Sequence, residues 1–154
     1  MDSERKVVAQ LGATIAFQEA DDRILKQLAD ISHYATVAAG TVLFAEGQLH
    51  TDIHFVDSGT IALEMVTRQC GKQRILTVGE GDLLAWSALL GDGRMTATAI
   101  ATTDASLITL SGERLQKLCD SDRDVGYVVM QSVARMISRR LLATRLQLLD
   151  LFHG

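Results

Sequence analysis

Residues 40–65, GTVLFAEGQLHTDIHFVDSGTIALEM, decide the fold that the sequence predicts. Short β-rich runs alternate here with glycines, which is typical of strands joined by tight turns. Because successive residues of a strand point to opposite faces, apolar residues at alternate positions can share one face of a sheet. These residues are Val42, Phe44, Ile53, Phe55, Ile61, Leu63 and Met65. Gly59 lies in DSGT between two runs and predicts a β-hairpin.

The framework continues through Gly81 and Asp82 into residues 85–97, AWSALLGDGRMTA. Its spacing resembles the cyclic nucleotide-binding domain of catabolite-activator and fumarate-nitrate regulators and of protein kinase A regulatory subunits, from roughly residue 15 onward. Upstream of Gly81 the matching positions are Gly40, Phe44, Glu46, Gly47, Phe55 and Gly59. The resemblance implies a mainly β fold with flanking helices: a double-stranded β-helix, or jelly-roll, barrel followed by a long C-terminal dimerisation helix.

The length of 154 residues fits one domain, 1–154, without an internal linker. We expect a helical segment over about 1–32, the β-barrel over 33–110 and C-terminal helices over 111–154. Hydrophobic residues make up 47% and charged residues 22%, and no apolar run approaches the ~18 residues of a membrane helix. The N-terminus MDSERKVVAQ lacks the apolar core of a signal peptide, so a cytoplasmic protein is expected.

Periodicity and turn residues predict the individual elements. Asp21 and Asp22 precede an i, i+4, i+7 apolar pattern and predict a helix that packs on the barrel. Gly71 in QCGK predicts a second hairpin turn. Strands are expected over about 34–38, 42–45, 53–57, 60–66, 74–77, 95–101 and 106–109.

Two helices are predicted to close the chain. Ser111 can cap a short one, and Ser121 with Asp124 predicts a capping box for a long one over about 122–152. Within the long helix, residues alternately three and four apart form a largely apolar stripe, which is typical of a helix that lies along a partner helix. This dimer stripe consists of Tyr127, Met130, Ala134, Ile137, Leu141, Thr144, Leu148 and Leu151.

A second face of the long helix is expected to pack on the barrel; it contains Val125, Val129, Val133 and Met136. At 1.5 Å per residue the helix is ~45 Å long, whereas a barrel is only ~25–30 Å across, so the distal leucines need another partner. We therefore expect a homodimer. The alternative is that both apolar faces cover their own domain.

In the family that the chain resembles, the motif G-E-x-A-L begins a short helix whose backbone N–H groups meet the cyclic phosphate. Its Glu accepts the ribose hydroxyl, and a later Arg neutralises the phosphate. An ungapped alignment from Gly81 to Ala97 puts Ala85 at the Gly, Trp86 at the Glu and Met95 at the Arg, so both charged contacts disappear. The expected ligand pocket consists of Ala85, Trp86, Ser87, Ala88, Leu89, Arg94, Met95, Thr96 and Ala97.

These replacements leave three functions open. The first is a regulatory sensor whose reshaped pocket takes a different, less charged ligand. The second is a ligand-free protein-interaction module, with Trp86 closing the pocket and the dimer helix as its working surface. The third is cyclic AMP or cyclic GMP binding rescued by Arg94, which a one-residue bulge would turn inward.

Neither an enzyme nor a metal or cofactor site is expected. Cys70 and Cys119 lie far apart without C-x-x-C spacing, and no spacing suggests a Ser–His–Asp set or paired carboxylates. His50 and His54 lack a nearby third ligand, and the side chain of His54 is expected to face solvent or a neighbouring strand.

The net charge of −4 argues against a broad nucleic-acid-binding surface. The chain ends where the regulators that it resembles continue into a helix-turn-helix, so no direct DNA binding is expected. Output would pass through a separate partner protein that the sequence does not identify. Four arginines of the long helix suggest a polyanion site or, as we expect, a solvated face. They are Arg135, Arg139, Arg140 and Arg145.

Overall fold

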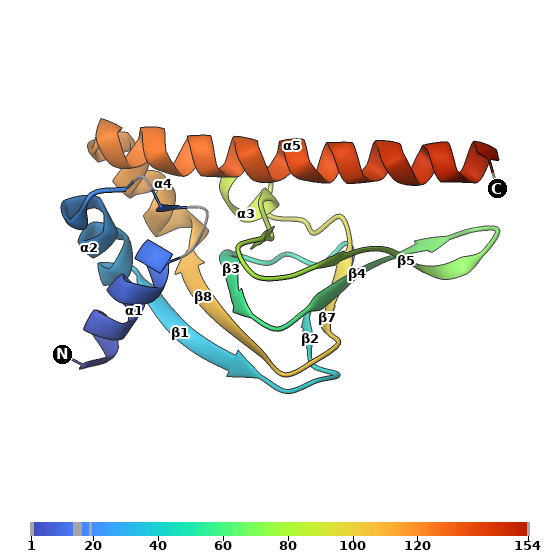
Figure 1. Ribbon diagram of the computed structural model, residues 1–154, viewed down its shortest axis with the longest axis horizontal. Coiled ribbons are helices and arrows are strands. Elements are labelled where there is room, and N and C mark those ends of the chain that lie inside the picture. Colours follow the sequence, from blue (N-terminus) through green and yellow to red (C-terminus); the bar gives the residue numbers. More distant parts are fainter. Residues whose placement is uncertain (1, 14–16, 19, 154) are drawn as a thin grey trace.

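The computed structural model describes residues 2–13, 17–18 and 20–153. In chain order the elements are α1 (Asp2–Ala13), α2 (Asp22–Asp30), β1 (Ser32–Val37), β2 (Val42–Phe44), β3 (Asp52–Ser58), β4 (Ile61–Thr67), β5 (Gly71–Val78), β6 (Leu83–Leu84), α3 (Ser87–Leu90), β7 (Thr98–Ala101), β8 (Ala105–Ser111), α4 (Gly112–Ser121) and α5 (Arg123–His153). The fold is mainly β with flanking helices, as predicted (Figure 1).

The described strands form two antiparallel four-stranded sheets, in the orders β1-β8-β3-β6 and β2-β7-β4-β5. The hairpin predicted at Gly71 is confirmed, since β4 pairs with β5 and Gly71 has a φ of 67°. The hairpin predicted at Gly59 is wrong, because β3 and β4 belong to different sheets. Gly59 does have a positive φ of 87°, but it carries the chain between the sheets; a Cβ there would collide with the carbonyl oxygen of Asp104.

The apolar residues of the predicted strands contribute to two hydrophobic clusters. Ile53 and Phe55 of β3 pack with the helices, whereas Ile61 and Leu63 of β4 face the barrel interior. The exposed fraction of the Val42 side chain is 54%, because a register shift in β2 separates it from Phe44. Met65 is also exposed, on the part of β4 that extends toward the β4–β5 turn. Alternation therefore identified strands better than it identified their faces.

The N-terminal helices pack against one side of the sheets. Asp21 caps α2 as the sequence predicts, with its carboxylate accepting a hydrogen bond from the Ile24 backbone N–H at 2.9 Å. Ile24, Leu25 and Leu28 are buried in the cluster that also contains residues of α1, α4 and α5. The sequence prediction had not resolved α1 as a separate helix. Figure 1 shows α1, α2 and α4 gathered at the end of the molecule where α5 begins.

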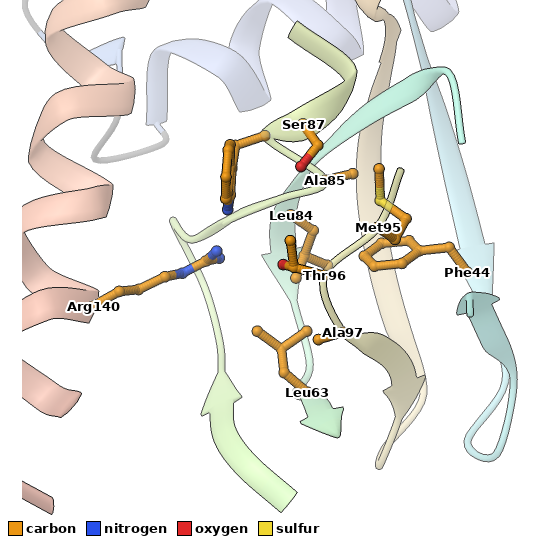
Figure 2. Close-up of a pocket in the computed structure, with 10 residues that line it drawn as sticks. Phe44, Leu63, Leu84, Ala85, Ser87, Met95, Thr96, Ala97 and Arg140 are labelled. Atoms are coloured by element: carbon orange, nitrogen blue, oxygen red, sulfur yellow. The ribbon is translucent and has the colours of Figure 1, made fainter. Parts of the chain in front are cut away.

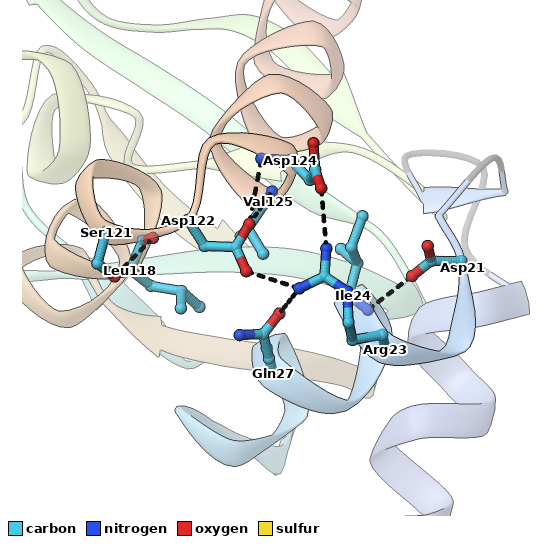
Figure 3. A network of polar contacts seen from close by, with 9 residues as sticks. All are labelled: Asp21, Arg23, Ile24, Gln27, Leu118, Ser121, Asp122, Asp124 and Val125. Carbon is cyan, nitrogen blue, oxygen red and sulfur yellow. Dashed lines mark hydrogen bonds and ion pairs between the residues drawn. The ribbon is translucent and has the colours of Figure 1, made fainter.

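The cap of α5 differs from the predicted capping box. Asp122 Oδ1 accepts the backbone N–H groups of Asp124 and Val125, whereas the Ser121 hydroxyl donates to the Leu118 carbonyl (Figure 3). Arg23 of α2 donates to both Asp122 and Asp124, at 2.7 and 3.1 Å. Asp122 is the N-cap of α5 because its carboxylate accepts hydrogen bonds both from the α5 amides and from this arginine.

α5 begins beside α4 and then runs along one side of the strands toward the end of the β4–β5 hairpin (Figure 1). The face predicted to pack inward is buried: Val125, Val129, Val133 and Met136 are at most 2% exposed. Ser111 caps α4 as predicted, accepting the Arg114 backbone N–H at 3.3 Å. Within the described part of the chain, no helix is long and apolar enough to cross a membrane.

Candidate functional site

The predicted pocket region begins where β6 ends. Ala85 follows this strand with a φ of 65°, a left-handed conformation that favours glycine and costs an alanine roughly 1–2 kcal/mol. The chain then forms the short helix α3, in which the Ala88 and Leu89 amides donate to the carbonyls of Ala85 and Trp86. Ala85 therefore keeps the backbone conformation that favours glycine, at the position where the family motif has a glycine.

A loop from β2 fixes the segment that follows α3. The Gly47 amide donates to the Met95 carbonyl at 2.8 Å, and the Met95 amide donates to the Gln48 carbonyl at 2.9 Å. This pairing turns the Met95 side chain inward, where it is 4% exposed. Arg94 points outward, is exposed and donates to the Gly47 carbonyl at 3.3 Å. The bulge that would turn Arg94 inward does not form, and Arg94 does not line the pocket.

Residues of strands β2, β4 and β6, of the segment 85–97 and of α5 line a small cavity of about 30 Å³ (Figure 2). A volume of this size holds about one water molecule. Six of the nine predicted pocket residues line it: Ala85, Trp86, Ser87, Met95, Thr96 and Ala97. Ala88, Leu89 and Arg94 do not. Phe44, Leu63, Leu84 and Arg140 complete the lining.

Arg140 is the pocket residue whose position the sequence prediction missed. Its side chain extends from α5 toward the strand segment with Thr96 (Figure 2). Its Nε and Nη2 atoms are buried and have no hydrogen-bond partner in the described part of the chain. Burial lowers the pKa of the Arg140 guanidinium, and the charge of Asp82 opposes that shift. The expected solvated face is therefore wrong for Arg140. Its helical spacing, four residues after the buried Met136, is the signal that places it on the inner face.

A histidine pair adjoins the pocket through Phe44. The Nε2 atoms of His50 and His54 lie 2.8 Å apart, and His54 Nδ1 lies 2.8 Å from the Thr109 hydroxyl. Burial, followed by the charges of His50 and His33, lowers the pKa of His54 to about 3, so the imidazole is neutral at ordinary pH. No group of three or more metal-ligating side chains occurs among the described residues.

The predicted dimer stripe is exposed at all eight of its positions. In the distal half of α5, the barrel side instead carries Arg140, Ala143 and Gln147; the Gln147 amide donates to the Ile75 carbonyl at 3.1 Å. The distal leucines therefore do not cover their own barrel. Leu142, Leu146, Leu149 and Phe152, which lie outside the predicted stripe, are exposed as well.

Residues 35–122 match the family model described as "Cyclic nucleotide-binding domain". The chain belongs to this family. The family is regulatory in kind, which agrees with the resemblance seen in the sequence. A search of curated proteins finds no significant match.

Several solved structures share the fold. A cyclic nucleotide-binding domain from Methylobacillus flagellatus is 16% identical, with a TM-score of 0.82, over 97% of this chain and 84% of that one. A putative cyclic nucleotide-binding protein from Geobacter metallireducens is 24% identical, with a TM-score of 0.75, over 92% and 98%. The N-terminal domain of a Streptomyces coelicolor transcriptional regulator is 25% identical, with a TM-score of 0.69, over 87% and 94%.

Proposed function

We propose that this chain is a non-catalytic regulatory module that binds a ligand other than a cyclic nucleotide, acts as a dimer and signals through a separate partner protein. The pocket is the observation that carries the proposal. Trp86 and Met95 stand at the positions where the family holds ribose and phosphate by charge, and the remaining cavity is about 30 Å³. Arg94, the arginine that would replace the lost cation, lies outside the pocket.

The energetic argument follows from the two missing contacts. Each charged hydrogen bond contributes about 1.5–3 kcal/mol, so losing two weakens binding by several orders of magnitude. A solved neighbour supports this reasoning. A Trypanosoma brucei kinase A regulatory subunit is described as cyclic AMP-independent, whereas a triple variant, with one substitution to arginine, is described as bound to cyclic AMP.

Calorimetry with cyclic AMP and cyclic GMP tests the proposal. We expect no binding tighter than about 1 mM by the native chain. The double variant Trp86→Glu with Met95→Arg should restore binding, whereas the uncharged control Trp86→Gln with Met95→Leu should not. Micromolar binding by the native chain would contradict the proposal, and its loss in Arg94→Ala would favour the cyclic-nucleotide alternative.

A second copy of the chain is the partner that we propose for the distal part of α5. Leu148 and Leu151 are 50% and 79% exposed, on a helix that continues past its buried section. An apolar stripe at alternating spacings of three and four suits a parallel or antiparallel copy of itself. The partner protein that receives the signal is proposed to bind elsewhere on the dimer.

The small size of the cavity also favours a second candidate, an interaction module without a ligand. A cavity of about 30 Å³ with Trp86 in its wall leaves little space in this conformation. The two candidates differ in the effect of a small ligand on thermal stability: a receptor is stabilised by its ligand, whereas an interaction module without a ligand site is not.

A further inference from the structure

The guanidinium of Arg140 is a buried cation with unsatisfied hydrogen-bond donors. Two of its three nitrogens, Nε and Nη2, are shielded from solvent and lack a hydrogen-bond partner in the part of the chain that the structure describes. Side-chain cations of this kind are rare, because burying an unpaired charge is strongly unfavourable. Within the described chain Arg140 is therefore a cation available to bind an anion.

The pocket determines where this partner binds. Arg140 extends from α5 into a cavity whose other walls are mainly apolar, with Leu63, Leu84 and Met95 among them. Ser87 and Thr96 add two hydroxyl groups. Such a pocket presents one fixed cation, two neutral donors and a hydrocarbon surface.

We propose that Arg140 binds the charged end of a short aliphatic monocarboxylate, whose hydrocarbon end packs against the apolar walls. The inference rests on the proposed function, because it names the ligand class of the same pocket. A planar carboxylate matches the two parallel donors of a guanidinium, and one negative charge matches one positive charge. The small cavity favours a ligand of few carbons, and binding requires Trp86 to move aside.

A phosphate group fits this site less well. α3 has only four residues, and its Ala88 and Leu89 amides already donate within the turn, so these two amides are not available to an anion. Asp82 is the carboxylate whose charge acts on Arg140, but its Oδ2 accepts the Gly79 amide and no ion pair joins it to Arg140 within the described chain. A doubly charged phosphate would face a single cation and this acidic neighbour.

Thermal unfolding and calorimetry of the full chain test the inference, with sodium acetate, propionate and butyrate as probes. Sodium chloride at equal ionic strength and uncharged butyramide are the reference solutes. We expect butyrate to raise the Tm saturably by about 3 °C and butyramide to have no effect. Arg140→Met keeps the length of the side chain without its charge and should weaken butyrate binding at least about tenfold. Arg139→Met, an exposed neighbour on the same helix, is the matched control and should bind as the native chain does.

Each result decides the question. Equal butyrate responses in Arg140→Met and Arg139→Met would overturn the inference, because they would mean unspecific binding. If Arg140→Met unfolds, Arg140→Lys takes its place: it retains the charge without the planar fork and should bind butyrate more weakly than the native chain, and equal affinity would contradict the assignment. If the native chain binds neither carboxylates nor cyclic nucleotides, this inference alone fails. If it binds cyclic AMP instead, the proposed function fails.

Discussion

Two arginines next to α5 have opposite surroundings: Arg23 of α2, at the start of α5, and Arg140, in its middle. At the start, Arg23 is half exposed and donates to Asp122, Asp124 and Gln27, so one guanidinium joins α2 to the α5 cap (Figure 3). In the middle, Arg140 has two buried nitrogens without a partner in the described residues, beside a cavity. Both terminal nitrogens of the exposed Arg23 are paired, whereas two nitrogens of the more buried Arg140 have no partner in the described chain.

This contrast separates a structural contact from a candidate binding contact. A satisfied network at an exposed junction holds two helices in place and needs nothing further. A buried cation beside a small apolar cavity destabilises the empty protein and leaves binding energy for an anion. The distal part of α5 adds a third case, in which apolar rather than polar groups lack a partner.

The largest effect is expected in the distal part. The double variant Leu141→Asp with Leu148→Asp should weaken dimerisation at least about 100-fold, because each carboxylate would be buried against an apolar partner. Sedimentation velocity over a concentration series measures this effect. The control Arg139→Asp also adds negative charge to an exposed α5 position, but outside the dimer stripe, and should change the dimer constant less than about tenfold. A native chain that stays monomeric at high micromolar concentration would contradict the proposed dimer.

The junction of α2 and α5 gives the next effect. Asp122→Ala removes the cap and the main partner of Arg23, so we expect the Tm to fall by about 4 °C. Ser121→Ala is the matched control and should lower the Tm by less than about 1 °C, because within the described chain the Ser121 hydroxyl bonds only to the Leu118 carbonyl. Thermal unfolding followed by circular dichroism measures both changes. A larger fall in Tm for Ser121→Ala than for Asp122→Ala would instead support the capping box that the sequence predicted.

Sequence reasoning succeeded where the signal was local. Alternating apolar residues and glycines identified the strands, and the carboxylate of Asp21 identified the start of α2. It failed where tertiary packing decides. DSGT is compatible with a hairpin, yet close contact with Asp104 sends Gly59 across to the other sheet. Ser121 and Asp122 are both good caps, and only the position of Arg23, 99 residues away, favours Asp122.

The site shows the same division. Six pocket residues were predicted correctly from the single segment 85–97, because residues that are close in sequence also lie close together in space. Arg140 lies more than forty residues downstream, and its charge does not distinguish it from the other arginines of α5. Only the register that continues the buried face through Val129, Val133 and Met136 brings it to the pocket. Continuing the predicted inner face of the helix past Met136, with polar residues included, would have identified Arg140.

His54 is a buried group that is satisfied in only one protonation state. Neutral imidazole can pair with both His50 and Thr109, and burial lowers the pKa of His54 from 6.5 to about 3. The unfolded chain therefore binds this proton more readily than the folded chain as pH falls from about 6.5 to about 3. Over that interval the free energy of unfolding should fall by roughly 1 kcal/mol per pH unit. Urea unfolding of the native chain and of His54→Gln between pH 7.5 and 5.5 measures the difference.

His54→Gln should flatten the pH dependence of the native chain. Equal slopes in the native chain and in His54→Gln would mean that this imidazole does not titrate differently in the folded and unfolded states.

The smallest effect is the one that tests the contrast between the arginines most directly. Without added anion, Arg140→Met should raise the Tm by about 2 °C, because it removes an unpaired buried charge and keeps the packing of a long side chain. Arg23→Met should lower the Tm, because it breaks the contacts to Asp122 and Asp124. Differential scanning calorimetry in a buffer without carboxylates measures both. A lower Tm in Arg140→Met would mean that this guanidinium stabilises the empty fold, and the two arginines would then differ in position but not in role.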